Sequence, residues 1–123
     1  MATHNEQGRR GEEIAAMYLQ DRGYCILERN WRSGKLELDL VAEKDGVLVF
    51  VEVKTRHDED YGSPLDAVDR RKQRHILLAA DAYVCLKKCD LSVRFDLISV
   101  LYDGENWHVE HYEDAFSPGL LFA

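Results

Sequence analysis

Apolar and polar residues are arranged in the middle of the chain in a pattern that is typical of a β-hairpin. Residues 35–42 and 47–54 each form a mostly apolar run, and Asp45-Gly46 between them is a tight-turn signal. The second run opens with five consecutive apolar residues, Val-Leu-Val-Phe-Val. That pattern predicts a central strand covered on both faces of a sheet.

Charged residues interrupt both predicted strands. Because side chains alternate along a strand, we expect Glu37, Asp39 and Val41 to share one face of the first strand, and Glu52 and Lys54 to share one face of the second. A carboxylate in a sheet is costly unless it is paired, hydrogen-bonded or bound to a metal. Two carboxylates and a lysine on adjacent strands therefore form a candidate divalent-metal site with a cation beside it.

The remaining elements follow from helical periodicity, alternation and turn residues. The sequence predicts a helix over about 6–22, a strand over 24–31, a second helix from Pro64 to about Lys87, and strands over 91–101 and 106–112. The order is α-β-β-β-α-β-β, and a strand, long helix and strand in succession imply a parallel crossover within a mixed sheet. We expect an α/β fold, with helices flanking a central mixed β-sheet, in a single domain over 1–123.

Composition narrows the class of protein. With 46% hydrophobic and 32% charged residues, the 123-residue chain is long enough to bury a core. The first residues lack an apolar signal region, and no apolar run approaches the roughly 18 residues of a membrane span. We expect a cytoplasmic protein with no membrane partner. The net charge of −7 argues against a strongly basic nucleic-acid binder, although five carboxylates in 101–123 leave the first hundred residues near −2.

Local groups of basic residues remain. Arg70, Arg71, Lys72 and Arg74 fall within five residues, in the middle of the predicted second helix, and Arg56 follows the second charged strand. Such residues either contact phosphates or form an ordinary solvated surface, and the sequence favours neither.

Two further carboxylates have competing explanations. Glu12 lies beside the apolar face of the first helix, where it complements the helix dipole unless that helix packs over Asp39 and Glu52. Asp96 lies within an apolar strand, and pairing with Arg94 on the same face is its simplest explanation.

The series Glu12, Asp39 and Glu52-Val53-Lys54, with twelve residues between Asp39 and Glu52, resembles the PD-(D/E)XK nuclease superfamily. Over nearly the whole chain, the sequence more narrowly resembles the YraN-like family of small bacterial proteins, itself similar to archaeal Holliday-junction resolvases. The segments that carry this resemblance are Gly8-Arg-Arg-Gly-Glu-Glu, Trp31-Arg32, Gly34-Lys-Leu-Glu-Leu-Asp-Leu-Val-Ala, Phe50-Val-Glu-Val-Lys-Thr-Arg, Tyr61-Gly-Ser-Pro, Lys72-Gln-Arg, Arg94-Phe-Asp and residues 111–116.

The resemblance implies a restriction-endonuclease-like fold and metal-dependent hydrolysis of phosphodiester bonds in double-stranded or branched DNA. Asp39 and Glu52 would hold Mg²⁺ or Mn²⁺, with Glu12 as a further ligand directly or through water, and Lys54 would orient the attacking water. On such DNA, the local basic clusters make Arg56 and three residues of the second helix the candidate DNA contacts: Arg70, Lys72 and Arg74. Resolution of a junction needs two cuts related by symmetry, for which a homodimer is the usual arrangement, although the sequence shows no dimer surface.

The sequence departs from the superfamily in two places. Leu38 stands where the superfamily has the proline of its name. Gln73 is followed four residues later by Leu77 rather than by tyrosine, so the sequence does not support the Gln-x-x-x-Tyr subclass. Two alternatives to a nuclease remain: a non-catalytic nucleic-acid-binding protein on the same fold, and a structural domain in which Glu52 and Lys54 only pair with neighbours. Charge spacing alone favours the structural domain, and the resemblance favours the nuclease.

Overall fold

The computed structural model describes residues 4–57 and 62–117, so Tyr61 of the family motif lies outside the described residues. The elements are α1 (His4–Asp21), β1 (Cys25–Ser33), β2 (Leu36–Lys44), β3 (Val47–His57), a short 3-10 turn η1 (Pro64–Ala67), α2 (Arg70–Lys87), β4 (Ser92–Tyr102) and β5 (Trp107–Tyr112). The strands form one sheet in the order β1-β2-β3-β4-β5. Neighbouring strands are antiparallel except β3 and β4, which are parallel and joined through α2. The expected α/β architecture and element order are confirmed.

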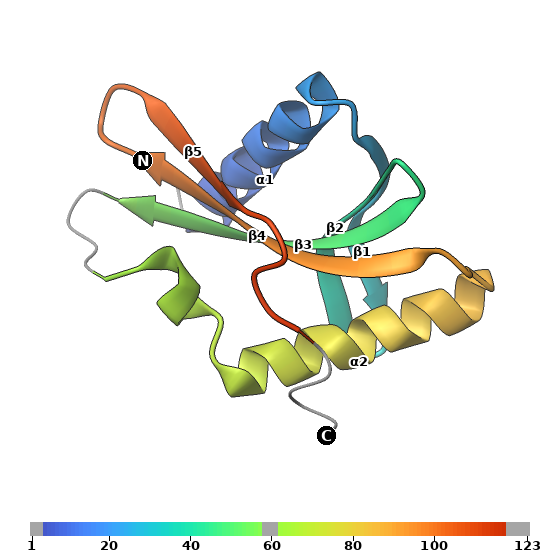
Figure 1. Cartoon of the computed structure of the whole chain (residues 1–123). Helices are drawn as coiled ribbons and strands as arrows, with labels where there is room; N and C mark the ends of the chain where they lie inside the picture. The colour runs from blue at the N-terminus through green and yellow to red at the C-terminus, as the bar shows by residue number, and fades with distance from the viewer. Residues whose placement is uncertain (1–3, 58–61, 118–123) are drawn as a thin grey trace.

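Helices cover both faces of the sheet. Figure 1 shows α1 on one face and α2 on the other. Apolar residues of β3 alternate between the two sides: Leu48 and Phe50 pack in the core beneath α2, whereas Val49 and Val51 pack beneath α1. Full burial of each such side chain is worth roughly 1.5–3 kcal/mol. The prediction that this strand lies at the centre, covered on both faces, is therefore confirmed.

The predicted second helix is wrong at its start. Ser63 caps only the four-residue turn Pro64–Ala67, and α2 begins at Arg70. Asp69 is the N-cap of α2, and its Oδ1 accepts a hydrogen bond of 2.8 Å from the backbone N–H of Lys72. An aspartate is among the best N-cap residues, so it starts a new helix here. The basic residues of this region consequently lie in the first turns of α2 rather than in its middle.

Alternation is also interrupted in β2. Leu38 and Val41 pack in the core beneath α2, whereas Leu40 packs beneath α1. The expectation that Glu37, Asp39 and Val41 share a face is therefore wrong. The interruption lies opposite Asn30 of β1, whose φ of 51° is left-handed, a conformation that asparagine tolerates better than most residues. Because of this interruption, the side chain of Asp39 does not follow the regular alternation of faces along β2.

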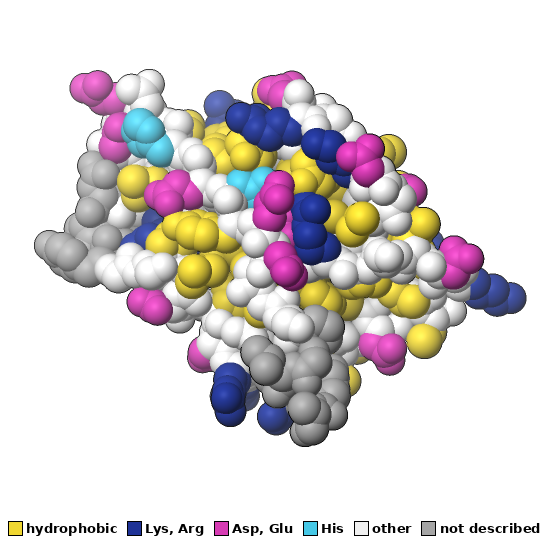
Figure 2. Space-filling model, in the orientation of Figure 1, with side chains coloured by type: hydrophobic (Ala, Val, Ile, Leu, Met, Phe, Trp, Pro, Cys, Tyr) yellow, Lys and Arg dark blue, Asp and Glu magenta, His cyan; other side chains and the backbone are white. Residues whose placement is uncertain are grey.

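Charges of both signs are spread over the surface. In the view of Figure 2, small groups of Lys and Arg side chains are separated by acidic and apolar ones. Within the part of the chain that the structure describes, neither helix is long and apolar enough to cross a membrane.

Candidate functional site

The candidate site begins where β2 and β3 separate. The paired residues of the two strands run from Lys44 and Val47 to Leu40 and Val51. Beyond this point a side chain replaces the backbone ladder, because the Val53 N–H donates a hydrogen bond of 2.9 Å to Oδ2 of Asp39. The carboxylate of Asp39 is thereby held between the two strands.

Glu52 lies beside Asp39, and the two carboxyl groups share a hydrogen bond. Burial raises the pKa of Glu52 to about 8, and the negative charge of Asp39 adds to the increase. Burial likewise raises the pKa of Asp39, although the hydrogen bond from Val53 opposes this. The pair therefore holds a proton at neutral pH when no metal ion is bound.

A cation is already present at this pair. Nζ of Lys72, in the first turn of α2, lies 3.2 Å from Oε1 of Glu52. Burial lowers the pKa of Lys72, but the hydrogen bond to Glu52 and the negative charges of Glu52, Asp39 and Glu37 together outweigh it, so the net direction is upward. Lys72, which we expected to contact DNA, lies beside the carboxylates in this structure.

Glu12 reaches this region because α1 approaches β3 closely. Gly11 is buried, and a Cβ atom at its position would collide with Oγ1 of Thr55 in β3. Glu12 is partly buried, accepts a hydrogen bond from the Asn30 side chain, and lies close enough to Asp39 for their charges to interact. Burial is the main cause that raises its pKa. Thus α1, β2 and β3 bring all three predicted acidic residues into one region.

Lys54 lies in a pocket next to this region. It is exposed and, within residues 4–57 and 62–117, forms no ion pair. Together with Glu12 it lines a pocket of about 430 Å³ between α1 and the end of β3. The structure therefore places Lys54 near Glu12 and Lys72 on Glu52.

The donor set suits a hard divalent cation. Among the described residues no three His, Cys, Asp or Glu side chains lie close enough to form a complete metal cage. Mg²⁺, however, is usually held by one or two carboxylates, with water and substrate phosphates completing the shell. Asp39 and Glu52 offer such oxygens, and the Lys72 ammonium shows that the pair accommodates a cation. The residues therefore fit Mg²⁺ or Mn²⁺.

A basic pocket adjoins the carboxylate pair through Lys72. It has a volume of about 380 Å³ at the start of α2. Arg70 is exposed next to it, whereas Arg56 donates a hydrogen bond of 2.8 Å to the Gly62 carbonyl. The residues that line the basic pocket are Asp69, Arg71, Lys72, Arg74, His75 and Leu78.

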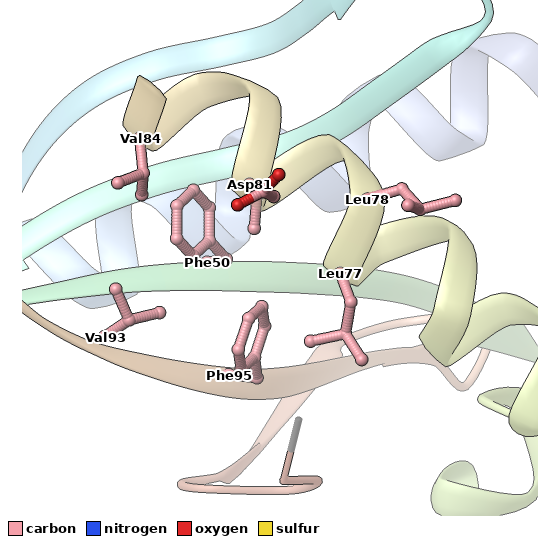
Figure 3. Close-up of a pocket in the computed structure, with 8 residues that line it drawn as sticks. Phe50, Leu77, Leu78, Asp81, Val84, Val93 and Phe95 are labelled. Atoms are coloured by element: carbon pink, nitrogen blue, oxygen red, sulfur yellow. The ribbon is translucent and has the colours of Figure 1, made fainter. Parts of the chain in front are cut away.

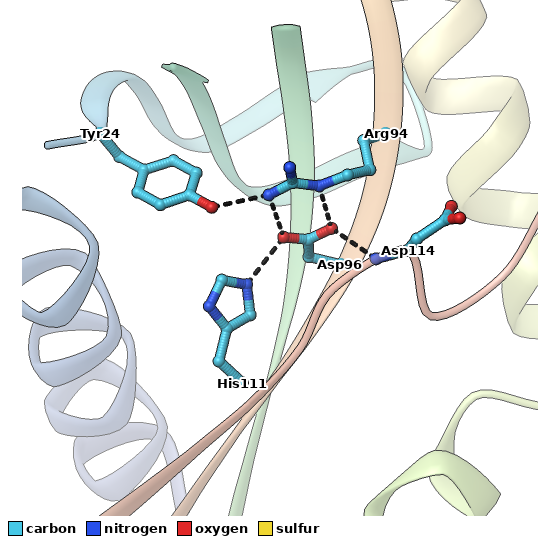
Figure 4. Close-up of polar contacts among 5 residues, drawn as sticks. All are labelled: Tyr24, Arg94, Asp96, His111 and Asp114. Atoms are coloured by element: carbon cyan, nitrogen blue, oxygen red, sulfur yellow. Dashed lines mark hydrogen bonds and ion pairs between the residues drawn. The ribbon is translucent and has the colours of Figure 1, made fainter. Parts of the chain in front are cut away.

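A second polar cluster has a different character. Asp96 is fully buried, and Figure 4 shows four groups converging on or next to its carboxylate. Arg94 donates to both oxygens at 2.8 and 2.9 Å, His111 contacts Oδ2 at 2.7 Å, and the Asp114 N–H donates at 3.0 Å. The expected pairing of Asp96 with Arg94 is confirmed. Both carboxylate oxygens of Asp96 accept hydrogen bonds, and Arg94 also donates to the Tyr24 hydroxyl. The cluster therefore connects β4 to Tyr24, which precedes β1, and to Asp114, which follows β5.

An apolar pocket of about 450 Å³ lies between α2 and the sheet. Figure 3 shows Phe50 and Phe95 from the strands and Leu77 and Val84 from α2 facing it. Asp81 is the one carboxylate in its lining. A single carboxylate among apolar side chains is a poorer cation site than the carboxylate pair.

Three contributors to the site were not anticipated from the sequence. Asn30 left one signal, because asparagine is uncommon inside strands. Gly11 left another, because glycine weakens a helix interior and implies a close approach. The contact of Lys72 with Glu52 left no signal, because it depends on how α2 lies over the sheet.

Comparison with known proteins gives the family. Residues 11–100 match the model of the family described as "Uncharacterised protein family UPF0102". The chain belongs to this family. It is the YraN-like family that the motifs indicated.

Full-length relatives in the family are closely similar. A UPF0102 protein of Bacteroides thetaiotaomicron is 48% identical over 121 residues, covering 98% of this chain and 100% of the relative. One from Porphyromonas gingivalis is 50% identical over 123 residues, covering 98% and 90%. Among solved structures, Pyrococcus furiosus SfsA in complex with Ca²⁺ matches with a TM-score of 0.34 and 15% identity, over 87% of this chain and 62% of that one. That likeness is too slight to carry an argument.

Proposed function

We propose that this protein is a metal-dependent nuclease that hydrolyses phosphodiester bonds of double-stranded or branched DNA. The observation that carries the proposal is the pair Asp39 and Glu52, which lies at the separation of two strands and already holds a cation. Glu12 stands beside the pair, so the acidic set implied by the resemblance to PD-(D/E)XK nucleases gathers in one place. A purely structural ion pair would not need two buried carboxyl groups that share a hydrogen bond.

The residues would divide the work as follows. Asp39 and Glu52 would hold Mg²⁺ or Mn²⁺, and Glu12 would bind it through water. The ion, when bound, supplies Lewis acidity and lowers the pKa of a coordinated water. The hydrogen bond from Val53 keeps the Asp39 carboxylate oriented, and Lys54 would steady the attacking water from the neighbouring pocket.

Calorimetric titration of Mn²⁺ into the wild type and Asp39→Asn tests the metal site. Asparagine keeps an acceptor for the Val53 N–H and so preserves the local hydrogen bond. We expect the wild type to bind and the variant to bind at least about tenfold more weakly. Equal affinity in both proteins would remove the carboxylate pair from the metal site.

Cleavage assays on flapped, branched and double-stranded DNA then test the activity. The wild type should cut with Mg²⁺ or Mn²⁺, and Asp39→Asn, purified identically, should not. If the wild type binds no metal even with uncleavable phosphorothioate DNA present, the nuclease proposal fails and the non-catalytic DNA-binding alternative replaces it. Symmetric cutting of a junction would also require a dimer, which sedimentation of the protein with junction DNA would detect.

We further propose that the start of α2 contacts the DNA backbone. Arg74 lines the basic pocket and Arg70 is exposed next to it, so phosphates in this region would lie close to the carboxylate pair. Arg74→Glu should weaken DNA binding and lower the slope of affinity against salt by about 0.9 or more. Lys88→Glu, at the opposite end of the same helix, makes the same charge change and should leave that slope unchanged. Equal effects of the two variants would exclude a local contact.

A further inference from the structure

Lys72 occupies an unexpected position. It belongs to a helix start rich in cations, yet its ammonium lies against Glu52 at 3.2 Å. The Glu52 side chain is only 16% exposed and that of Lys72 only 39%, so the ion pair is partly withdrawn from water. Asp39 and Glu37 also attract the ammonium.

An ammonium and a divalent ion cannot share these oxygens. Mg²⁺ binds carboxylate oxygen at about 2.0–2.1 Å, closer than the ammonium lies now. Two cations on one carboxylate pair would repel strongly in a partly buried site. Metal binding to Asp39 and Glu52 must therefore displace Lys72 from Glu52.

The basic pocket at the start of α2 can receive the displaced ammonium of Lys72. The lysine side chain is a flexible four-carbon stem, and that of Lys72 already lines the basic pocket with Arg71 and Arg74. Once it leaves Glu52, it adds a charge to the surface that we assign to phosphate binding.

We propose that Lys72 is a displaceable counterion: it neutralises Asp39 and Glu52 while the site lacks a divalent ion, and it becomes a phosphate-binding cation when the ion replaces it. This inference rests on the proposed metal site. It couples metal binding to DNA binding, and by linkage DNA must favour metal binding to the same degree. The family resemblance had placed the lysine of the site at Lys54.

Lysine acetylation mapped by mass spectrometry tests the displacement in the wild-type protein. An ammonium held by a carboxylate reacts slowly, so saturating Mg²⁺ should raise the acetylation rate of Lys72 about tenfold relative to metal-free protein. Lys88, which is exposed at the opposite end of α2 and forms no ion pair among the described residues, is the internal control and should react equally in both conditions. In Asp39→Asn, Mg²⁺ should leave the rate at Lys72 unchanged.

The outcomes separate the two proposals. If calorimetry detects metal binding but the rate at Lys72 stays the same or falls, Lys72 is not displaced, and this inference fails while the metal site stands. If no metal binds under any condition, both proposals fail.

The salt dependence of DNA binding gives a second readout. Using phosphorothioate DNA that cannot be cut, the slope of log affinity against log salt should be about 0.9 smaller for Lys72→Met than for the wild type when Mg²⁺ is present. With a chelator instead of Mg²⁺ the two slopes should agree, because Lys72 is then held by Glu52. A difference of equal size in both conditions would show that Lys72 is always free to bind phosphate, which overturns the inference.

Discussion

Replacing Glu52 by glutamine tests the electrostatics of the site without any choice of DNA. The fold raises the pKa of Glu52 from an ordinary 4.5 to about 8, mainly through burial. Between these values the folded protein holds the proton more tightly than the unfolded chain does. The free energy of unfolding of the wild type must therefore fall as pH rises from about 4.5 to 8, and Glu52→Gln must lack this contribution.

The size of the effect follows from the same values. Each pH unit in the interval is worth about 1.4 kcal/mol, so the full contribution of Glu52 is about 5 kcal/mol. Domains of this size are stable by only about 5–15 kcal/mol, so the change is large enough to measure. Lys72 does not change this pH dependence. Because its pKa is raised, its contribution to the free energy of unfolding is constant below about pH 10.

Urea unfolding at a series of pH values, followed by tryptophan fluorescence with a chelator present, provides the assay. We expect the difference in unfolding free energy between Glu52→Gln and the wild type to grow by about 3–5 kcal/mol in favour of the variant from pH 5 to pH 9. Glutamine keeps an acceptor for Lys72, so the packing is preserved. Glu105→Gln, in an exposed turn, controls for the loss of one negative charge and should run parallel to the wild type. Parallel curves for the wild type and Glu52→Gln would refute the buried, proton-sharing pair.

Two further predictions concern the frame of the site. Gly11→Ala should lower the unfolding free energy by about 1–3 kcal/mol, because the new methyl group collides with Thr55. Gly8→Ala is the control: its methyl group meets no atom within 4 Å, so the variant should be neutral or stabilised by up to about 1 kcal/mol. Thermal unfolding of both variants measures the difference, and equal losses of stability would contradict the close approach of α1 to β3. Asp96→Asn should cost about 3–5 kcal/mol at pH 7, because Arg94 loses its buried partner. The pKa of Asp96 is lowered, since hydrogen bonds from its partners outweigh the effect of burial, so its contribution is present above pH 4 and fades in more acidic solution; a pH-independent difference in urea unfolding would contradict this assignment.

Local patterns in the sequence determined the elements and much of the architecture. The apolar run of β3 identified the central strand, because a strand covered on both faces needs apolar side chains at every position. The pairing of Arg94 with Asp96 was equally local, since residues two apart on a strand share a face. The acidic set Glu12, Asp39 and Glu52 came from a resemblance of motifs, and chain order alone does not bring its members together.

The tertiary structure decided how the site is built. Asp39 departs from the alternation of β2 opposite Asn30, where β1 has a left-handed backbone conformation. Glu12 lies near Asp39 because Gly11 allows α1 to approach β3 closely. Lys72 meets Glu52 only because α2 crosses back over the sheet. The repeat of two residues in a strand, or of 3.6 in a helix, determines which face of its own element a residue occupies. Contacts between elements depend on how the helices are placed on the sheet, and the packing of the core determines that placement.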